Sequence, residues 1–383
     1  MGINSCIGNT LEEVTHALQN GISGTRFNPT YAELNFKSHI SAAAEQDFDG
    51  IDLAAVENAG LTAEQIGGNP RYGIAGGSGG GSTASVVEMK ELLDTKGARK
   101  VGPFFVPRNM SNTITANVGV AFKMQGVAHT ITSACATSAD AIGYAYNLIQ
   151  LGKQDLMLAG GGEEDHWSQS LLFDAMGALC SKYNDTPETA SRPYSADRDG
   201  FVIAGGGGFV VLESLEHAQA RGANILAEVV GYAANSDGAD MVAPSGEGAT
   251  RCVLMALEEA KQHGVDKIDY VNTHGTSTPA GDITELKAME RAFGEGQVPP
   301  LSSTKSMTGH SLGAAGVQEA IYSVLMMQND FIAPNINVTE LDEGAKPFDI
   351  VLEKRDAKLN TVMSNSFGFG GVNACLIFKK WEG

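Results

Sequence analysis

One cysteine stands in a setting that could make it chemically reactive. Cys135 lies in Thr-Ser-Ala-Cys-Ala-Thr-Ser, residues 132–138, directly before a helix-forming run that ends near Gly152. The N-terminus of a helix presents unpaired backbone N–H groups and a partial positive charge, which favour a thiolate over a thiol. The sequence therefore predicts that Cys135 is an activated nucleophile able to attack a carbonyl carbon. A small, buried core residue is the alternative.

Two histidines and a lysine in the last third of the chain also lie in short polar segments that contain glycine. His274 lies in Asn-Thr-His-Gly-Thr-Ser-Thr-Pro, residues 272–279, after an apolar stretch, as is typical of a strand that ends in a functional loop. Lys305 and His310 lie in residues 302–311, before an alanine-rich helix. A single histidine of this kind usually only satisfies hydrogen bonds, but two in matched settings together with a cysteine indicate a catalytic set.

The elements that must position these residues form two similar halves. Strand-like and helix-like segments alternate, and a glycine-rich apolar segment closes each half, at residues 201–214 and 362–379. In the second half, apolar residues recur at helical spacing and predict helices near residues 248–263, 282–293 and 315–328. Because no linker rich in proline, glycine and serine separates the halves, we expect one domain, residues 1–383, with halves of about 1–224 and 225–383.

The cysteine, histidines and lysine, in this order, resemble those of the β-ketoacyl-(acyl-carrier-protein) synthases, the condensing enzymes of fatty-acid synthesis. The resemblance runs from about residue 1 to 383, and four longer motifs are similar to the synthase I branch in particular. These are Gly-Gly-Gly-Glu-Glu (160–164), Phe-Asp-Ala-Met-Gly-Ala-Leu (173–179), the glycine-rich segment 198–208 and Ser-Asn-Ser-Phe-Gly-Phe-Gly-Gly (364–371). The resemblance implies an α/β thiolase-like duplicated fold in five layers, α-β-α-β-α, and a homodimer.

The resemblance also implies a decarboxylative Claisen condensation that needs no cofactor. Cys135 would take the acyl chain from its carrier as a thioester, and the backbone N–H groups of Cys135 and Phe369 would bind the oxyanion. Malonyl-acyl-carrier-protein would then lose CO2, and His274 and His310 would hold the enolate before it attacks. The product would be a 3-oxoacyl-acyl-carrier-protein two carbons longer. The two histidines favour this carrier-dependent elongating branch over thiolases and enzymes that start from acyl-CoA, which use asparagine or a second cysteine.

Further residues receive supporting roles from the same resemblance. Lys305 would pair with Glu285 and tune the histidines electrostatically. Thr276 and Thr278 match positions that hydrogen-bond the pantetheine arm of the carrier, with ordinary loop capping as the alternative. Phe369 matches a gating residue beside the nucleophile. The positions where some relatives hold a structural monovalent cation are Asn272, Glu319, Ser364 and Asn365.

The charge of the chain restricts its partners. A net charge of −19 argues against nucleic acid. It also means that docking an acidic acyl carrier protein requires a local basic surface. Residues 95–139 contain no aspartate or glutamate and lead to the nucleophile, and their basic residues are Lys96, Arg99, Lys100, Arg108 and Lys123. We expect this stretch to dock the carrier, although a run of charges is more often only a solvated surface.

Composition fits a cytoplasmic location. No apolar run approaches the ~20 residues that cross a bilayer, and the first residues lack the features of a secretory signal. The opening Met-Gly does not complete a myristoylation pattern, because Cys6 stands where that pattern has serine or threonine. The five cysteines are scattered and odd in number, which argues against a disulfide framework and against a zinc site.

Two segments of the family pattern are missing from this sequence. The chain begins inside the loop that usually follows the first strand, and about twenty residues from the front of an early helix are absent between Asp52 and Leu53. Loss of a strand would expose a sheet edge. We therefore expect intact catalytic residues but altered stability, carrier docking and chain-length preference.

Three other functions remain open at this point. A non-catalytic partner subunit of the same fold typically lacks the cysteine, which is present here. An enzyme that decarboxylates malonyl carrier without condensing would not hold an acyl chain on Cys135. A synthase II type is disfavoured by the motif at 160–164 and by Ala-Pro-Ser-Gly-Glu-Gly at 243–248.

Overall fold

Two five-stranded mixed sheets organise the molecule, whose computed structural model describes residues 1–44 and 50–383. The first sheet has the order β1 (Gly2–Asn4), β8 (Gly206–Glu213), β6 (Leu156–Glu163), β4 (Tyr72–Gly77) and β5 (Ala128–Thr130). The second has the order β9 (Ala227–Ser236), β15 (Val372–Lys380), β14 (Thr361–Gly368), β10 (Tyr270–Asn272) and β11 (Leu301–Ser302).

The two sheets repeat one pattern of strand directions. In each, the last three strands in these orders run parallel, and the first two pair antiparallel with their neighbours. The structure therefore confirms the predicted duplicated α/β architecture. Strand β1 corresponds to β9, β4 to β10, β6 to β14 and β8 to β15.

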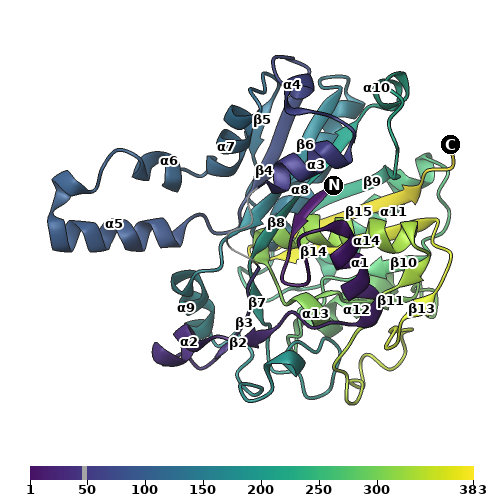
Figure 1. The fold of residues 1–383 in the computed structure, drawn as a ribbon. Coiled ribbons are helices and arrows are strands. Elements are labelled where there is room, and N and C mark those ends of the chain that lie inside the picture. Colours follow the sequence, from purple (N-terminus) through teal and green to yellow (C-terminus); the bar gives the residue numbers. More distant parts are fainter. Residues whose placement is uncertain (45–49) are drawn as a thin grey trace.

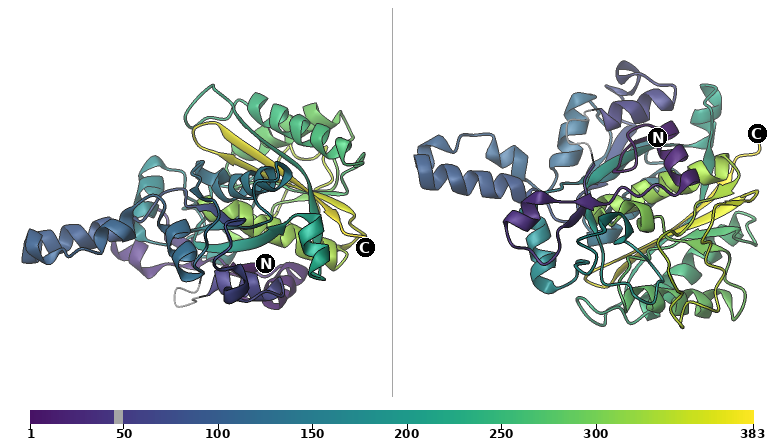
Figure 2. Two further views of the ribbon diagram at one scale, coloured as in Figure 1. Left: turned by 90° about the horizontal axis from the view of Figure 1, so that it is seen from above. Right: turned by 60° about the horizontal axis from the view of Figure 1, so that its bottom comes forward.

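Helices lie between and outside the sheets (Figures 1 and 2). The central layer holds α8 (Thr137–Gln150) and α14 (Ala315–Gln328), which pack against each other and against strands of both sheets. Helix α14 is buried along nearly its whole length, as its apolar composition requires. The outer layers are α3 (Ile51–Asn58) and α7 (Thr113–Ala121) on the first sheet and α11 (Glu247–Gln262) with α12 (Gly281–Phe293) on the second. The five predicted layers are thus present.

Shorter elements complete the chain. They are α1 (Leu11–Asn20), β2 (Arg26–Phe27), α2 (Pro29–Glu33), β3 (Ile40–Ala42), α4 (Ala63–Ile66), α5 (Thr83–Lys96), α6 (Phe105–Asn109), α9 (Trp167–Met176), β7 (Ile203–Ala204), α10 (Leu215–Ala220), α13 (Lys305–Thr308), β12 (Phe331–Ile332) and β13 (Arg355–Asp356). No helix in the described ranges is both long and apolar enough to cross a membrane.

Glycines let the backbones of the first sheet approach each other. A Cβ atom on Gly160 of β6 would lie 2.0 Å from the carbonyl oxygen of Gly208 on β8. Any larger residue at position 160 would therefore push the two strands apart. This explains the glycine clusters that stand out in the sequence.

The outer edges of the two sheets differ in length. Strand β9 pairs with β15 at nine positions, whereas β1 pairs with β8 only at Gly207, Gly208 and Phe209. Within the described residues, no strand pairs with Val210–Glu213 on the side of β8 that faces away from β6.

An arm formed by α5 and α6 projects from the body of the protein (Figures 1 and 2). It exposes large apolar side chains, since Phe104 is 74% and Val106 75% accessible to solvent. Single exposed apolar residues are common on protein surfaces, and these two are close neighbours in the sequence of one projecting arm.

Candidate active site

The predicted nucleophile lies on a strained turn at the start of the buried helix α8. Cys135 is the middle residue of a short 3-10 turn, Ala134–Ala136, and Ala134 has a φ of 48°. This left-handed conformation is costly for a residue with a Cβ atom and tends to persist where a functional site requires it. The second half repeats the turn at Leu312–Ala314, before α14, and there Leu312 also has a φ of 48°.

Two histidines from the second half face this cysteine. His310 Nε2 lies 3.0 Å from the Sγ of Cys135, and the rings of His274 and His310 are 5.2 Å apart and perpendicular. One ligand atom from each of the three residues lies within 4.8 Å of the others. His274 follows β10 and His310 follows α13, so the loops after two neighbouring strands, β10 and β11, bring them to the first half's nucleophile.

Both histidines are held in the neutral form. Burial lowers their pKa values well below the usual 6.5, and the positive charge of Lys305 lowers them further. Among the described residues, neither Nδ1 atom has a hydrogen-bond partner. Each ring can therefore carry its proton on either nitrogen, and each can accept or donate through Nε2.

Burial opposes the thiolate form of Cys135 that its place before a helix favours. Burial raises the pKa of this thiol to about 12, and this effect outweighs the charge of Lys305 and the backbone N–H groups of Phe369 and Cys135, which all lower the pKa. Desolvation penalises an anion more than a helix N-terminus favours it at this position. The resting group is a thiol, so its attack requires a base, and His310 is the group in reach.

The loop after β14 brings a second backbone donor to the nucleophile. Gly368 packs so closely that a Cβ atom there would lie 3.0 Å from both the backbone N of Cys135 and the carbonyl oxygen of Ser133. The N–H groups of Phe369 and Cys135 both reach the sulfur. Two donors that converge beside a reactive side chain fit the oxyanion hole expected from the sequence. The Phe369 ring is 37% exposed and lies 6.4 Å from the ring of Phe173.

The expected ion pair between Lys305 and Glu285 is corrected by the structure. The Lys305 ammonium pairs with Glu319, and both side chains are almost fully buried. The Glu285 carboxylate instead accepts hydrogen bonds of 2.8 Å from the backbone N–H groups of His274 and Gly275. Burial raises the pKa of each glutamate to about 7. Glu285 thus fixes the backbone of His274, and Lys305 acts on the histidines through its charge.

The loop that carries the two threonines is held by a buried carboxylate. The hydroxyl oxygens of Thr276 and Thr278 lie 3.0 Å apart, on partly exposed side chains. Asp282 accepts hydrogen bonds from the backbone N–H groups of Ser277 and Tyr194 and faces the Arg198 guanidinium at 3.4 Å. Sequence reasoning did not identify Asp282 or Arg198, because only the folded chain shows that they share this loop.

Glu163, the fourth residue of the Gly-Gly-Gly-Glu-Glu motif, joins both halves next to the nucleophile. Its carboxylate accepts hydrogen bonds from the Gly79 N–H at 2.8 Å, the Gly313 N–H at 2.9 Å and the Ser78 hydroxyl at 2.6 Å. In the sequence this motif supported only a resemblance to the family. The feature that could have identified Glu163 is an acidic residue at the end of a glycine-rich buried strand, because a buried carboxylate needs several hydrogen-bond donors.

An apolar cluster lies beside the sulfur of Cys135. Its members come from α2 and the residues after it, from α9 and the residues after it, from the segment around β7 and from the turn before α14. They are Tyr31, Phe36, Trp167, Phe173, Ala178, Leu179, Phe201, Ile203 and Leu312. These positions are far apart in the sequence, which is why no pattern in the chain indicated them.

The four residues matched to a monovalent-cation position are all buried near Lys305 and Glu285. Asn272 and Ser364 are paired neighbours on β10 and β14, and Asn365 donates a hydrogen bond to Glu285 at 3.3 Å. One oxygen of Glu319 has no hydrogen-bond partner among the described residues. The Lys305 ammonium already supplies a positive charge here, so the carboxylate is neutralised without a bound cation.

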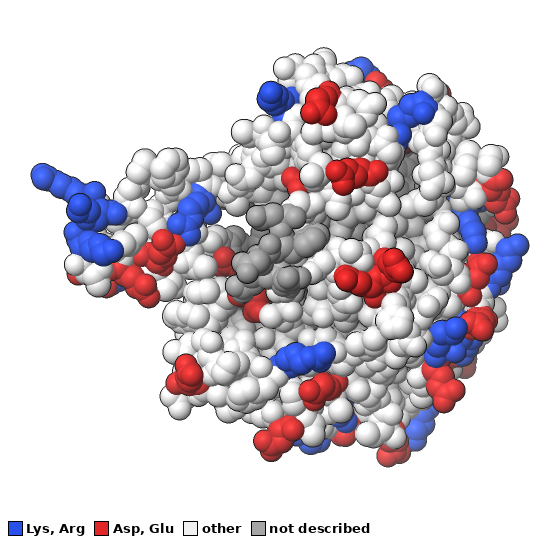
Figure 3. Space-filling model, in the orientation of Figure 1, with Lys and Arg blue, Asp and Glu red and all other residues white. Residues whose placement is uncertain are grey.

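The basic residues expected at the docking surface do not form one island beside Cys135. Lys96, Arg99 and Lys100 lie at the far end of α5, at the tip of the projecting arm (Figure 3). Arg108 is paired with Glu88 on the arm. Lys123 lies on the body, where its carbonyl accepts a hydrogen bond from Gly68 after α4. The expectation of one island was wrong because the arm carries basic residues that are near Cys135 in the sequence to a separate part of the surface.

Comparison with known proteins is consistent with this geometry. Residues 53–218 match the family model "Beta-ketoacyl synthase, N-terminal domain" and residues 226–339 match "Beta-ketoacyl synthase, C-terminal domain". The chain is 53% identical to 3-oxoacyl-[acyl-carrier-protein] synthase 1 of Escherichia coli (strain K12) over 401 aligned positions, which cover 99% of this chain and 97% of that protein.

Solved structures have the same fold. A beta-ketoacyl synthase from Burkholderia phymatum STM815 superposes with a TM-score of 0.90 and 36% identity, over 100% of this chain and 98% of that one. A type II polyketide ketosynthase, solved in complex with its acyl-carrier protein, also superposes with a TM-score of 0.90, at 29% identity and with the same coverage.

Proposed function

The chain belongs to the β-ketoacyl synthase family, and we propose that Cys135, His274 and His310 perform its condensation. The reaction joins an acyl chain to malonyl-acyl-carrier-protein and releases CO2 and a 3-oxoacyl-acyl-carrier-protein, in fatty-acid elongation. The observation that carries the assignment of roles is the convergence of one thiol and two neutral imidazoles within 4.8 Å.

The first half-reaction loads the acyl chain onto Cys135. As Sγ attacks the thioester carbonyl of the acyl carrier, His310 Nε2, 3.0 Å away, accepts the thiol proton. The N–H groups of Cys135 and Phe369 bind the oxyanion. When the carbon–sulfur bond to the pantetheine breaks, the proton passes from His310 to the departing thiolate. The acyl chain remains in the apolar cluster beside Cys135.

The second half-reaction forms the carbon–carbon bond. For this step both imidazoles carry their proton on Nε2, which the partner-free Nδ1 atoms of the described structure allow. The malonyl thioester carbonyl accepts hydrogen bonds from these Nε2–H groups of His274 and His310, which stabilise the enolate formed as the carbon–carbon bond to CO2 breaks. The enolate carbon then attacks the acyl thioester on Cys135, and the sulfur leaves as a thiolate. The thiolate takes one proton from water, which balances the negative charge that the malonyl carboxylate brought in. Neutral imidazoles suit this step because they donate hydrogen bonds without giving up a proton to the enolate.

Glu285 and Lys305 position and tune these groups. Glu285 fixes the main chain of His274 and Gly275 through two hydrogen bonds. Lys305 keeps both histidines neutral through its charge, supported by Glu319. The hydroxyls of Thr276 and Thr278 hydrogen-bond the pantetheine arm, and Phe369 gates the approach to Cys135.

The partners are an acyl carrier protein and a second copy of the chain. The three basic residues at the arm's tip, Lys96, Arg99 and Lys100, attract an acidic carrier. The exposed Phe104 and Val106 on the same arm are covered by the second copy. The five cysteines, all unpaired, fit a reducing cytoplasm.

Intact-mass spectrometry after incubation with a medium-chain acyl carrier protein tests the assignment. We expect one acyl adduct on the wild-type protein and none on Cys135→Ala. The matched control is Cys6→Ala, because Cys6 is also free and partly buried but lies outside the site, and it should still be acylated. An adduct that persists in Cys135→Ala, or a folded wild-type protein that forms none, would overturn the proposal.

A further inference from the structure

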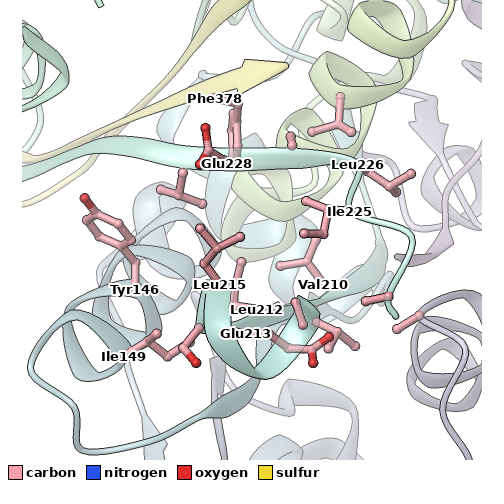
Figure 4. A pocket seen from close by; sticks show the side chains of 18 of the residues that line it. Tyr146, Ile149, Val210, Leu212, Glu213, Leu215, Ile225, Leu226, Glu228 and Phe378 are labelled. Carbon is pink, nitrogen blue, oxygen red and sulfur yellow. The ribbon is translucent and has the colours of Figure 1, made fainter. Parts of the chain in front are cut away.

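Two enclosed carboxylates lie at opposite ends of the paired strands β6 and β8. Glu213 on β8 lies opposite Leu156 and borders a cavity of about 600 Å³, where Figure 4 shows it in the lining. The Arg221 guanidinium balances its charge. Glu163 ends β6 on the side of the catalytic residues, and among the described residues no cation pairs with it. The second carboxylate is therefore held in a different way from the first.

Glu163 is held by neutral hydrogen-bond donors although it is only 5% exposed. Its five donors come from both halves of the chain: Ser78, Gly79, Gly80, Gln169 and Gly313. Four of them are N–H groups, which can only donate, so both oxygens of Glu163 act as acceptors, as in a carboxylate. A buried charge without a counter-charge is costly to a fold. Such a group persists where its acceptor atoms are needed.

One oxygen of Glu163 joins the catalytic turn to its counterpart in the second half. Its Oε2 atom accepts hydrogen bonds from the N–H groups of Gly79 at 2.8 Å and Gly313 at 2.9 Å, and Gly313 is the middle residue of the second turn. Gly79 also packs on the first turn, because a Cβ atom on Gly79 would lie 3.2 Å from the carbonyl oxygen of Ala134. Ala134 is the left-handed residue directly before Cys135. The carboxylate thus supports the strained turn through Gly79.

The next residue, Glu164, holds the base of the projecting arm. Its carboxylate accepts hydrogen bonds from the Thr83 hydroxyl at 2.7 Å, the Ala84 N–H at 2.9 Å and the Ser82 hydroxyl at 3.0 Å. Ser82 is the N-cap of α5, so the negative charge of Glu164 also meets the positive end of the helix dipole. Helix α5 is about 21 Å long, and a tilt of about 15° at its base would move the tip by about 5 Å.

We propose that these adjacent carboxylates are positioning residues with separate roles in acylation. Glu163 holds the turn from which Cys135 attacks, and Glu164 sets the direction of the arm whose basic tip attracts the carrier. The inference rests on the proposed function, because it assigns one residue to the chemical step and the other to docking. It also gives a physical role to both acidic residues of the Gly-Gly-Gly-Glu-Glu motif.

The charge of Glu163 acts on the nucleophile as well. After burial, which raises the pKa of Cys135, the positive charge of Lys305 lowers this pKa and the negative charge of Glu163 raises it. The two charges therefore oppose each other at the sulfur. Replacing Glu163 with glutamine removes the negative charge and favours the thiolate, whereas Glu164 has its hydrogen bonds on the arm.

The test compares Glu163→Gln with Glu164→Gln, two matched variants of neighbouring residues. Time-resolved intact mass at several concentrations of acyl carrier protein gives the maximal acylation rate and the half-saturating carrier concentration. Glutamine offers one acceptor oxygen in place of two, so Glu163→Gln should lower the maximal rate by about tenfold or more and leave half-saturation nearly unchanged. Glu164→Gln should instead raise the half-saturating concentration by about threefold or more and leave the maximal rate nearly unchanged.

Alkylation by iodoacetamide measures Cys135 without any carrier. At pH 8, Glu163→Gln should be alkylated at Cys135 about threefold faster or more than the wild type, because loss of the charge favours the thiolate. Glu164→Gln should react at the wild-type rate. Melting temperatures show whether the variants are folded. If Glu163→Gln does not fold, Ser78→Ala takes its place: it removes one hydrogen bond to the carboxylate but keeps the charge, and should slow acylation without faster alkylation.

The outcomes separate this inference from the catalytic assignment. Separate effects of the two variants on rate and half-saturation would support it. Changes of the same parameter in both variants, or a Glu163→Gln variant with normal acylation, would overturn it while the wild type still forms an adduct on Cys135. A folded wild type that forms no adduct would overturn the catalytic assignment, and the inference with it.

Discussion

The Sγ of Cys135 and the Nε2 of His310 lie 3.0 Å apart although 175 positions separate them in the chain. The proposed nucleophile belongs to the first half and its proposed base to the second. Because burial raises the pKa of the Cys135 thiol to about 12, we expect this contact to control whether acylation proceeds at neutral pH.

Replacing His310 should slow acylation of Cys135 far more than replacing His274. His310→Ala removes the base, and loss of a general base typically costs about 10²–10⁴-fold in rate. His274→Ala leaves the contact of Sγ with His310 in place and should chiefly reduce CO2 release from malonyl carrier. Time-resolved intact mass measures the first step and release of labelled CO2 the second. Equal acylation rates in the two variants would contradict these roles.

Lys305→Met should shift the acid limb of the pH profile for CO2 release toward higher pH. Burial is the larger cause that lowers the pKa values of both histidines, and the Lys305 charge lowers them further, so its removal raises these pKa values and increases the protonated fraction at mildly acidic pH. The wild type, with histidines neutral far below pH 6.5, should lose little activity in that range through these groups. A variant that loses the same fraction of activity at every pH would show that Lys305 acts only structurally.

The buried pair of Lys305 and Glu319 should contribute strongly to folding. Lys305→Met leaves a buried carboxylate without its partner, and breaking such a pair typically costs about 3–5 kcal/mol. The double variant Lys305→Met with Glu319→Leu should recover much of this loss. As a surface control, Lys354→Met breaks an exposed pair with Asp356 and should cost under ~1 kcal/mol. Urea unfolding measures all three, and a single variant as stable as the double one would contradict the buried-charge argument.

Gly368→Ala should reduce acylation while the protein stays folded. The added methyl group would lie 3.0 Å from the backbone N of Cys135 and would displace one wall of the oxyanion hole. Loss of one oxyanion donor costs about 10²–10³-fold in rate. Gly119→Ala, in α7 with nothing within 4 Å of its Cβ position, is the control and should retain full activity. Intact-mass spectrometry measures the acylation rate, and the melting temperature shows whether the variant stays folded. A normal acylation rate in Gly368→Ala would mean that the backbone at Gly368 does not shape the oxyanion hole.

Zinc ions should inhibit the enzyme reversibly. Cys135, His274 and His310 offer one sulfur and two nitrogen atoms within 4.8 Å of one another, and zinc binds such ligands in sites with three protein donors. Zinc would displace the thiol proton and block attack. We expect condensation to fall with added Zn²⁺ and to return with EDTA, and His310→Ala should bind the ion more weakly by calorimetry. Insensitivity to zinc would mean that the three groups cannot converge on one point.

The sequence alone identified the duplicated fold and the residues that meet at the site, since Cys135, His274 and His310 each stand in a local motif with a recognisable turn chemistry. These features depend on short segments, whose residue types and spacing are enough to predict the local structure.

The remaining features depend on packing between distant segments. Glu319 and Glu285 both lie on helices near Lys305, and only the fold shows which carboxylate meets the ammonium. The pKa of Cys135 is dominated by desolvation, which a sequence motif does not express. Similarly, Lys96 and Lys123 are near each other in the sequence but lie on the arm and the body.

The repeated left-handed turn makes the two halves of the fold unequal. Gly313 holds the place in the second turn that Cys135 holds in the first. A side chain does not fit at this second place, because a Cβ atom on Gly313 would lie 2.2 Å from the backbone N of Gly79. The asymmetry of the internal repeat therefore lies in the packing around the second turn rather than in the backbone of the turn itself.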